Sequence, residues 1–398
     1  MHKTLLAAPV IAGLALTAGT AAAQTVKIGV VSTYSGPTAQ QGDMMNRGWK
    51  LYDKLHQKDL PAGVKVEIIE RDDTGANPET SKRLAQEFVT RDHVNLLTGF
   101  VWSPNFMSVA PVATEAKLPV VSLNAAAIQA VGMSPYMVRT SFTLTQQAYP
   151  LGKWAAKQGY KKAYTAASDY APGNEGADAF AKSFTEAGGQ VLGQVKFPAP
   201  PTTPDFAPFL QRVKDAKPDL LYIFVPAGPQ ATAIMKAARD LDLKGAGITL
   251  ISTEDLVPDE EMRNIGDQAV GLVTSGIYTS DAARPANKEF VAAWYKEYGD
   301  KMPPDFESAD AWVGMKMIYD FIGKTKGKFS GDEAMKYFST WKDDNSPKGP
   351  VMIDPATRNI VQNVYMRRVE NQGGKLVDVE FENLGMMNAL GQPYAAAK

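Results

Sequence analysis

Short β-branched segments alternate with amphipathic stretches along most of the chain. Residues 26–31 (VKIGVV) and 64–70 (VKVEIIE) have the composition of strands, and residues 43–58 between them place apolar side chains near helical spacing. The alternation continues, with further strands expected near 94–100 and 119–123. Strands that alternate with helices predict a parallel sheet covered by helices.

A second series with the same architecture begins near Phe142. It contains predicted helices over 146–158 and 176–187 and predicted strands over 162–166 and 219–225. The fold class is therefore α/β, with two Rossmann-like lobes of comparable size, each built on a parallel sheet. Open parallel sheets bind ligands beyond the carboxyl ends of their strands, so we expect the functional site in a cleft between the lobes.

The first 23 residues have the features of a secretory signal peptide. Lys3 precedes an apolar stretch over 5–18, and small residues occupy 21–23. We expect cleavage after Ala23, which would release a periplasmic or secreted protein. A transmembrane anchor is the alternative, but the apolar run is shorter than the roughly 20 residues that a bilayer requires.

Composition and motifs narrow the classes of function. The 398 residues include 42 Lys+Arg, 43 Asp+Glu and no cysteine. A charge near zero does not favour nucleic acid or an anionic membrane surface, and without cysteine there is no disulfide or thiolate metal site. The motifs HExxH, GxSxG, GxxxxGK[ST] and a GxGxxG after the first strand are absent, and His56 and His93 are isolated. We expect no metal, no cofactor and no catalytic residues.

The starts of several predicted helices offer candidate binding groups. Ser103 and Pro104 follow a predicted strand, and this pair is typical of a helix N-terminus. Free N–H groups and a hydroxyl at the carboxyl edge of a sheet would suit a carboxylate. The alternative is that Ser103 only caps its own helix. Small residues at 124–127 and 173–176 mark equivalent junctions, where the backbone can approach a ligand closely.

Aromatic side chains gather at the same predicted strand ends. These residues are Tyr34, Phe100, Trp102, Tyr170 and Tyr278. A single aromatic residue at such a place is usually part of the core, whereas several that converge on a cleft would form the apolar wall of a ligand site.

Residues 27–43, KIGVVSTYSGPTAQQGD, resemble the opening of the branched-chain amino-acid binding proteins of ABC importers. Further segments match the same family, among them 70–78 (ERDDTGANP), 97–111 (LTGFVWSPNFMSVAP) and 348–351 (KGPV). The resemblance covers essentially the whole chain after residue 23. It implies the type I periplasmic binding protein fold, in which two lobes close on a solute and deliver it to an inner-membrane permease.

The resemblance also implies a division of the chain. The implied hinge crossings lie near 139–142, 277–280 and 348–350. The implied lobes are 24–140 with 279–348 and 141–278 with 349–398. We expect a monomer, because no heptad repeat or exposed apolar stripe indicates a dimer.

Several site residues follow from the resemblance. Ser103 would contact the ligand carboxylate, together with backbone groups of Asn124, Ala125 and Ala126. Glu254 falls where the binders of amino acids hold the ammonium group, and its alternative role is a helix cap.

Three positions depart from the pattern of the amino-acid binders. Gln41 and Pro172 each replace a Tyr, and Ala126 replaces a Thr. Because Trp102 and other aromatic residues lie beside Ser103, we expect a small carboxylate with an apolar or aromatic body. Branched-chain amino acids, amides and urea remain alternatives. Two other classes remain open: an exported sensor, and an α/β hydrolase that uses Glu254 with Asp169 or Asp255.

Overall fold

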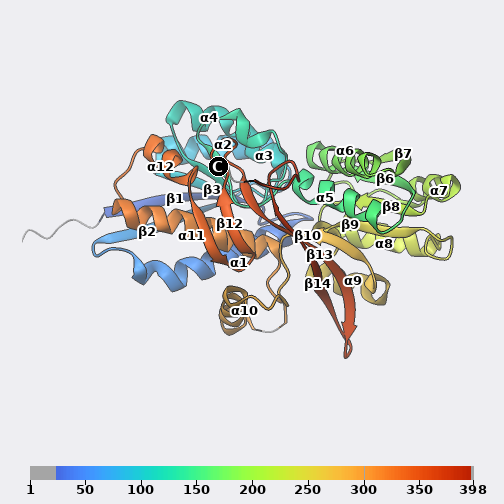
Figure 1. Ribbon diagram of the computed structural model, residues 1–398. Helices are drawn as coiled ribbons and strands as arrows, with labels where there is room; N and C mark the ends of the chain where they lie inside the picture. The colour runs from blue at the N-terminus through green and yellow to red at the C-terminus, as the bar shows by residue number, and fades with distance from the viewer. Residues whose placement is uncertain (1–23, 300, 396–398) are drawn as a thin grey trace, which may run out of the picture.

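The computed structural model describes residues 24–299 and 301–395, which form two α/β lobes (Figure 1). The segment interpreted as a signal peptide, residues 1–23, lies outside the described residues. The first lobe contains a five-stranded parallel sheet in the order β2-β1-β3-β4-β5. Its strands are β1 (Gln24–Ser32), β2 (Val64–Asp72), β3 (Leu96–Gly99), β4 (Val120–Ser122) and β5 (Met137–Arg139).

Helices cover this sheet, and local signals in the sequence set where they begin. The helices are α1 (Ala39–His56), α2 (Pro78–Glu87), α3 (Ser103–Ser108), α4 (Ala110–Ala116), α10 (Pro285–Tyr298), α11 (Phe306–Thr325) and α12 (Gly331–Phe338). The Asn77 side chain accepts a hydrogen bond from Thr80 N at the start of α2, and Ser330 and Glu333 form a capping box at the start of α12.

The second lobe repeats the arrangement with a larger sheet. Its parallel strands are β6 (Lys162–Ser168), β7 (Gln190–Phe197), β8 (Leu220–Phe224), β9 (Thr249–Thr253) and β10 (Val273–Gly276). Its helices are α5 (Leu144–Lys157), α6 (Ala171–Glu186), α7 (Ala207–Ala216), α8 (Pro229–Asp240) and α9 (Asp259–Ile265). Short 3-10 helices occupy Gln57–Asp59, Ala130–Met133, Glu254–Leu256 and Gly266–Ala269, and a π-helical turn occupies Phe88–Asp92.

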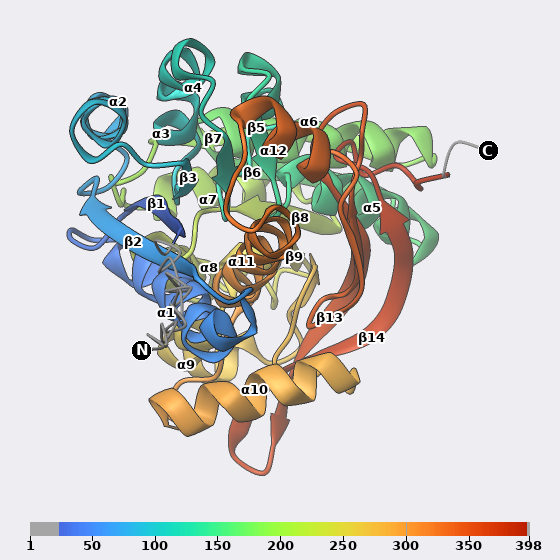
Figure 2. The ribbon, with the colours of Figure 1, turned by 90° about the vertical axis from the view of Figure 1, so that its left-hand side faces the viewer.

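Four antiparallel strands complete the second sheet. They are β11 (Lys342–Ser346), β12 (Gly349–Ile353), β13 (Ile360–Gln372) and β14 (Lys375–Met387). Figure 2 shows β13 and β14 side by side. The start of β13 pairs with β12, and its later part pairs with β10, so this one strand belongs to both lobes.

The segment 348–350, where the resemblance implies the third hinge crossing, lies at a hairpin turn. Gly349 (φ +90°) turns the chain into the β11–β12 hairpin. Val351 and Ile360 then pack in the core of the first lobe, whereas Val369 packs in the core of the second. We therefore place the third crossing within β13.

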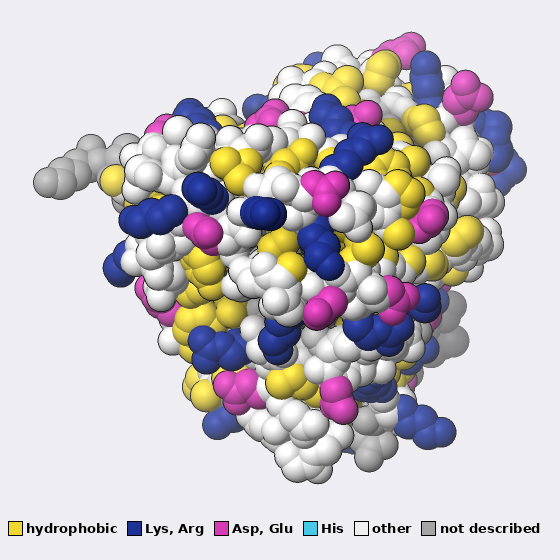
Figure 3. All heavy atoms as spheres, turned by 90° about the vertical axis from the view of Figure 1, so that its right-hand side faces the viewer, with side chains coloured by type: hydrophobic (Ala, Val, Ile, Leu, Met, Phe, Trp, Pro, Cys, Tyr) yellow, Lys and Arg dark blue, Asp and Glu magenta, His cyan; other side chains and the backbone are white. Residues whose placement is uncertain are grey.

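The lobes are closed against each other. One apolar cluster contains residues of both lobes, namely Met44 and Phe306 of the first lobe and Leu144 and Phe224 of the second. Phe142, at the first hinge crossing, belongs to the same cluster. Across the described part of the chain, no helix combines the length and the apolar character needed to span a membrane. The face of the second lobe in Figure 3 intersperses basic and acidic side chains, without a field of one sign.

Candidate functional site

A narrow cavity lies between the lobes, where strand ends of both sheets meet. The first lobe contributes Gln41, Val101, Trp102, Ser103, Asn124, Ala126 and Glu307. The first crossing and the second lobe contribute Phe142, Leu144, Tyr170, Pro172, Pro226 and Asp255. The cavity brings together six of the residues proposed from the sequence as candidates for the site: Gln41, Trp102, Ser103, Asn124, Ala126 and Tyr170.

Ser103 is buried at the cavity wall, and its hydroxyl oxygen accepts hydrogen bonds from Ala126 N and Ala127 N, both at 3.0 Å. It is the first residue of α3, and Trp102 occupies the cap position without a side-chain capping bond. The interpretation that Ser103 only caps its own helix is therefore wrong. Because its oxygen receives two N–H groups, the hydroxyl hydrogen is left to donate to a ligand.

The loop that follows β4 is tied to the loop that follows β3. Asn124 Nδ2 donates to Val101 O at 3.1 Å, and Ala125 N donates to Phe100 O at 3.0 Å. The amide of Ala125 is therefore used within the protein and does not face a ligand. Asn124 Oδ1 is buried and has no hydrogen-bond partner among the described residues.

Two aromatic side chains face each other across the cleft. The rings of Trp102, from the first lobe, and Tyr170, from the second, have centroids 6.4 Å apart. Tyr170 also stacks on Phe224, which fixes its orientation. The indole Nε1 of Trp102 is buried, and no described residue accepts a hydrogen bond from it. This wall therefore offers an aromatic surface and one unused N–H donor.

Gln41 connects the two lobes directly. Its Nε2 donates to Ala227 O, 186 residues away in the sequence, at 2.7 Å. On another part of the interface, Ile128 N donates to a carboxylate oxygen of Glu175 at 2.8 Å. Both bonds join different lobes, so they depend on closure.

Two of the expected ligand contacts lie away from the cavity. Phe100 is fully buried and packs on Phe106 in the core of the first lobe, because its positive φ of 68° after Gly99 turns the chain there. Tyr34 is half-buried, and burial and the nearby Glu70 carboxylate raise the pKa of its hydroxyl.

Glu254 also lies outside the cavity that Ser103 lines. Its carboxylate accepts hydrogen bonds from Ile277 N at 2.9 Å and from Gln147 Nε2, and it lies 3.5 Å from Arg367 Nη1. It is fully buried, and burial raises its pKa to about 8. Because protein groups surround this carboxylate, the structure gives it a place at the second crossing and no free position toward a ligand ammonium.

Two buried carboxyl groups line the cavity instead. Asp255 receives a hydrogen bond from Thr253 Oγ1 at 3.1 Å, and burial raises its pKa to about 6. Glu307 is 2% exposed, and burial raises its pKa well above the usual range. From the sequence, Asp255 is a candidate only for the hydrolase interpretation, and Glu307 is not a candidate, since an acidic residue in the first turn of a helix is common and gives no signal of a site.

The carboxyl groups of the hydrolase interpretation are not assembled into one site. Asp169 is exposed and bonds Asn174 Nδ2 at 3.0 Å, while Glu254 is enclosed at the second crossing. Only Asp255 reaches the cavity. Within residues 24–299 and 301–395, no cluster of His, Cys, Asp and Glu has the grouping of a metal site.

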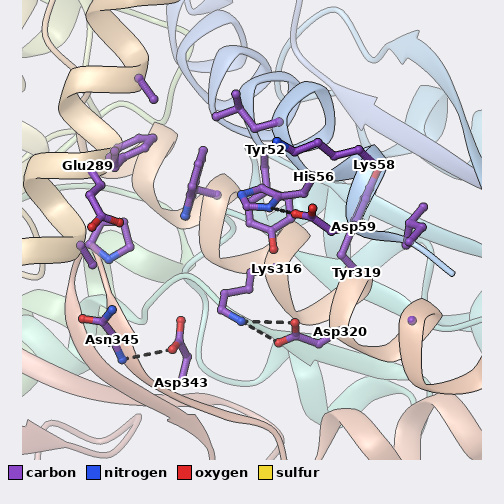
Figure 4. A pocket seen from close by; sticks show the side chains of 18 of the residues that line it. Tyr52, His56, Lys58, Asp59, Glu289, Lys316, Tyr319, Asp320, Asp343 and Asn345 are labelled. Atoms are coloured by element: carbon purple, nitrogen blue, oxygen red, sulfur yellow. Dashed lines mark hydrogen bonds and ion pairs between the residues drawn. The ribbon is translucent and has the colours of Figure 1, made fainter.

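A larger hollow lies elsewhere, on the outer side of the first lobe between α1, α10 and α11 (Figure 4). Its volume is about 760 Å³. Figure 4 shows two ion pairs among the residues that line it: His56 Nδ1 lies 2.8 Å from Asp59, and Lys316 Nζ lies 2.9 Å from Asp320. We regard this hollow as a solvated surface feature, because charged side chains that line it, among them Lys58, Asp59 and Glu289, are exposed to water.

Comparisons with known proteins agree with this architecture. The model of a family described as periplasmic binding protein matches residues 25–375. A curated relative from Brucella melitensis biotype 1, "Leu/Ile/Val-binding protein homolog 6", is 38% identical over 93% of each chain.

Solved structures extend the comparison to bound ligands. A solute-binding protein of an ABC transporter from Rhodopseudomonas palustris BisB5, in complex with 3,4-dihydroxybenzoic acid, is 42% identical, with a TM-score of 0.86 and coverage of 92% of this chain and 98% of that one. Another from R. palustris, in complex with 4-hydroxybenzoate, is 40% identical, with a TM-score of 0.88 and coverage of 92% and 99%. The chain belongs to the periplasmic binding protein family and has the two-lobed type I fold.

Proposed function

We propose that this protein is the periplasmic solute-binding component of an ABC importer and that it captures a small aromatic carboxylate between its lobes. The observation that carries the proposal is the cavity wall at Trp102 and Ser103, which combines an aromatic surface with hydrogen-bond donors that have no protein acceptor. The ligand would be bound without any bond being made or broken.

The donors suit the carboxylate of the ligand. A buried N–H group without a partner costs roughly 1–3 kcal/mol, so the indole Nε1 of Trp102 favours an occupant that accepts a hydrogen bond. The hydroxyl of Ser103 lies on the adjacent residue and has its hydrogen available. Two neighbouring donors match the two oxygens of a carboxylate, and hydrogen bonds to a charged acceptor are the stronger kind.

The remaining walls favour an aromatic body over an amino acid. Trp102 and Tyr170 provide two aromatic rings, tilted by 58° to each other, and Phe142 and Leu144 add apolar surface. Glu254 is already held by Ile277, Gln147 and Arg367, so it is not free for an ammonium group. Relatives about 40% identical to this chain bind hydroxylated benzoic acids, which supports the same ligand class here.

Closure would present the loaded protein to the permease. Gln41 and Ile128 each bond to the opposite lobe, so a closed, ligand-bound state has an interface that an open state lacks. We also propose that the protein acts as a monomer and that cleavage after Ala23 releases it. The family match begins at residue 25, which leaves the proposed signal peptide outside the conserved domain.

Isothermal titration of residues 24–398 tests the ligand class. The ligands are benzoate, 4-hydroxybenzoate, 3,4-dihydroxybenzoate, phenylacetate, leucine, valine and urea, added after unfolding and refolding have removed any co-purified solute. We expect binding of aromatic acids and none of leucine. Trp102→Phe keeps the ring and removes the N–H, and Ser103→Ala removes the hydroxyl; each should weaken aromatic acid binding roughly 10- to 150-fold.

A protein that binds leucine or valine and no aromatic acid would contradict the proposal and would support the function named for the Brucella relative. If the wild type and Trp102→Phe bound every aromatic acid with equal affinity, the indole N–H would not be a ligand contact.

A further inference from the structure

We propose that Glu307 and Asp255 recognise a hydroxyl group on the ring of the ligand and thereby select phenolic acids over unsubstituted aromatic acids. This inference rests on the proposed function, since it concerns the same cavity. It assigns a specificity role to two residues that come from different lobes.

The two carboxyl groups lie on opposite sides of the cleft and line one cavity. Glu307 is in the first turn of α11 in the first lobe, and Asp255 is in the short helix Glu254–Leu256 that follows β9 in the second. Both line the cavity that contains Trp102 and Ser103. Their exposed fractions are 2% and 8%, so closure places both acids out of contact with bulk water.

Glu307 has unused hydrogen-bonding capacity in this buried position. Its Oε2 is shielded from solvent and has no described residue in hydrogen-bonding geometry, while the neighbouring Asp305 carboxyl interacts with Glu307 and adds to the rise of its pKa. Asp255 has a single neighbouring side-chain donor, the hydroxyl of Thr253. A carboxyl group can accept several hydrogen bonds, and leaving a buried acceptor unpaired costs roughly 1–3 kcal/mol. An occupant that brings a donor removes this cost.

The charges of the cavity decide which part of a ligand faces these acids. Wherever Glu307 or Asp255 is ionised, a ligand carboxylate beside it would meet like charge, whereas the donors of Trp102 and Ser103 attract that carboxylate. A phenolic hydroxyl is a neutral donor that a buried carboxyl group can accept in either protonation state. Burial raises the pKa of both acids, which favours a neutral donor over a cation at this position.

The position of Glu307 is fixed by close packing. A Cβ on Gly48 of α1 would lie 2.2 Å from Ser308 O, so α1 approaches the start of α11 as closely as glycine allows. Asp305 Oδ1 accepts a hydrogen bond from Ser308 N at 3.0 Å and holds the first turn of the helix. A carboxyl group on such a rigid element can distinguish ligands that differ by one hydroxyl.

The test compares affinities for benzoate, 3-hydroxybenzoate and 4-hydroxybenzoate by isothermal titration of the mature chain. The wild type should bind one hydroxybenzoate at least roughly 10-fold more tightly than benzoate. Glu307→Met, which keeps the length of the side chain and removes both oxygens, should reduce that ratio to between about 1 and 3. Glu307→Gln should retain part of the preference, because its amide oxygen still accepts a hydrogen bond. Asp255→Asn should reduce the preference less than Glu307→Met.

Thermal unfolding without ligand checks that each variant is folded. If Glu307→Met does not fold, the two single variants Glu307→Gln and Asp255→Asn complete the test. An unchanged preference in the folded variants overturns this inference while leaving aromatic acid binding intact. Equal wild-type affinity for benzoate and both hydroxybenzoates overturns it as well. A wild type that binds none of the three acids contradicts the proposed function itself.

Discussion

The cavity between the lobes and the hollow on the outer side of the first lobe differ in both size and chemistry. The hollow is much the larger, but charged side chains that line it, such as Lys58 and Glu289, remain in contact with water (Figure 4). The cavity is narrow, and it contains buried donors and acceptors without protein partners, such as Trp102 Nε1 and Glu307 Oε2. Unmet hydrogen bonding in a closed space indicates a ligand site more clearly than volume does.

The largest effect is expected from pH, through the buried Asp255 of the cavity. The folded protein keeps the proton on this acid up to about pH 6, whereas an unfolded chain releases it near the ordinary value of about 3.9. The folded state therefore binds more protons in that interval, and the free energy of unfolding falls as pH rises from about 4 to about 6.

Asp255→Asn removes this titration. The variant should lose the corresponding slope and should gain up to roughly 3 kcal/mol over the wild type above pH 6. Urea unfolding at several pH values, without ligand, measures the difference. If the free energy of unfolding of wild type and variant changed in the same way with pH, Asp255 would not be desolvated in the folded state. The cavity would then be solvated, as the hollow is.

A smaller effect is expected from Gln41, which links the lobes beside the cavity. Gln41→Ala removes the hydrogen bond to Ala227 O and should weaken ligand binding by about 0.5–1.5 kcal/mol, which is roughly 2- to 12-fold. The loss should appear as faster ligand dissociation, measured by stopped-flow fluorescence, because the bond forms only in the closed state.

Gln40→Ala is the matched control for this variant, since Gln40 is the neighbouring residue on α1 and does not line the cavity. If the ligand dissociated at similar rates from both variants, the Gln41 hydrogen bond would not contribute to holding the lobes closed.

The smallest effect is expected in the hollow. Lys316→Met breaks the ion pair between Lys316 and Asp320. Because both side chains are about one-third exposed, the free energy of unfolding should change by less than about 1 kcal/mol. Ligand affinity should stay as in the wild type. If this variant weakened binding as much as Ser103→Ala does, the hollow would have to be counted as part of the functional site.

Strand and helix periodicity was sufficient to predict the two lobes and the edge of each sheet where the site lies. Ser103, Trp102 and Tyr170 follow strand ends directly, so their place in the cavity could be predicted from the order of elements alone. Phe100 could not be separated from them, because the positive φ that directs its backbone after β3 is a property of the folded turn.

Other errors arose where the outcome depends on tertiary packing. Glu254 and Asp255 are adjacent, and only the packing of the short helix after β9 decides that the second one reaches the cavity. Glu307 enters the cavity from a helix that lies about 200 residues beyond Ser103 in the sequence, and a single sequence gives no signal for that pairing. The resemblance implied a third crossing near 348–350, and only the folded chain shows that Gly349 turns into the β11–β12 hairpin at that place.

The strand β13 has a mechanical consequence for how the lobes separate. Its first residues are hydrogen-bonded to β12 in the first lobe, its later residues to β10 in the second, and β14 runs beside it over nearly its whole length. A hydrogen-bonded ladder resists stretching, since stretching would break several backbone bonds at once, but this ladder has register shifts between Asn363 and Tyr365 and between Met366 and Arg367. Irregularities of this kind bend a strand pair and increase its local twist. Release of a solute would then proceed as a torsion of this strand pair, with the two sheets turning about one axis while their separation along it stays constant.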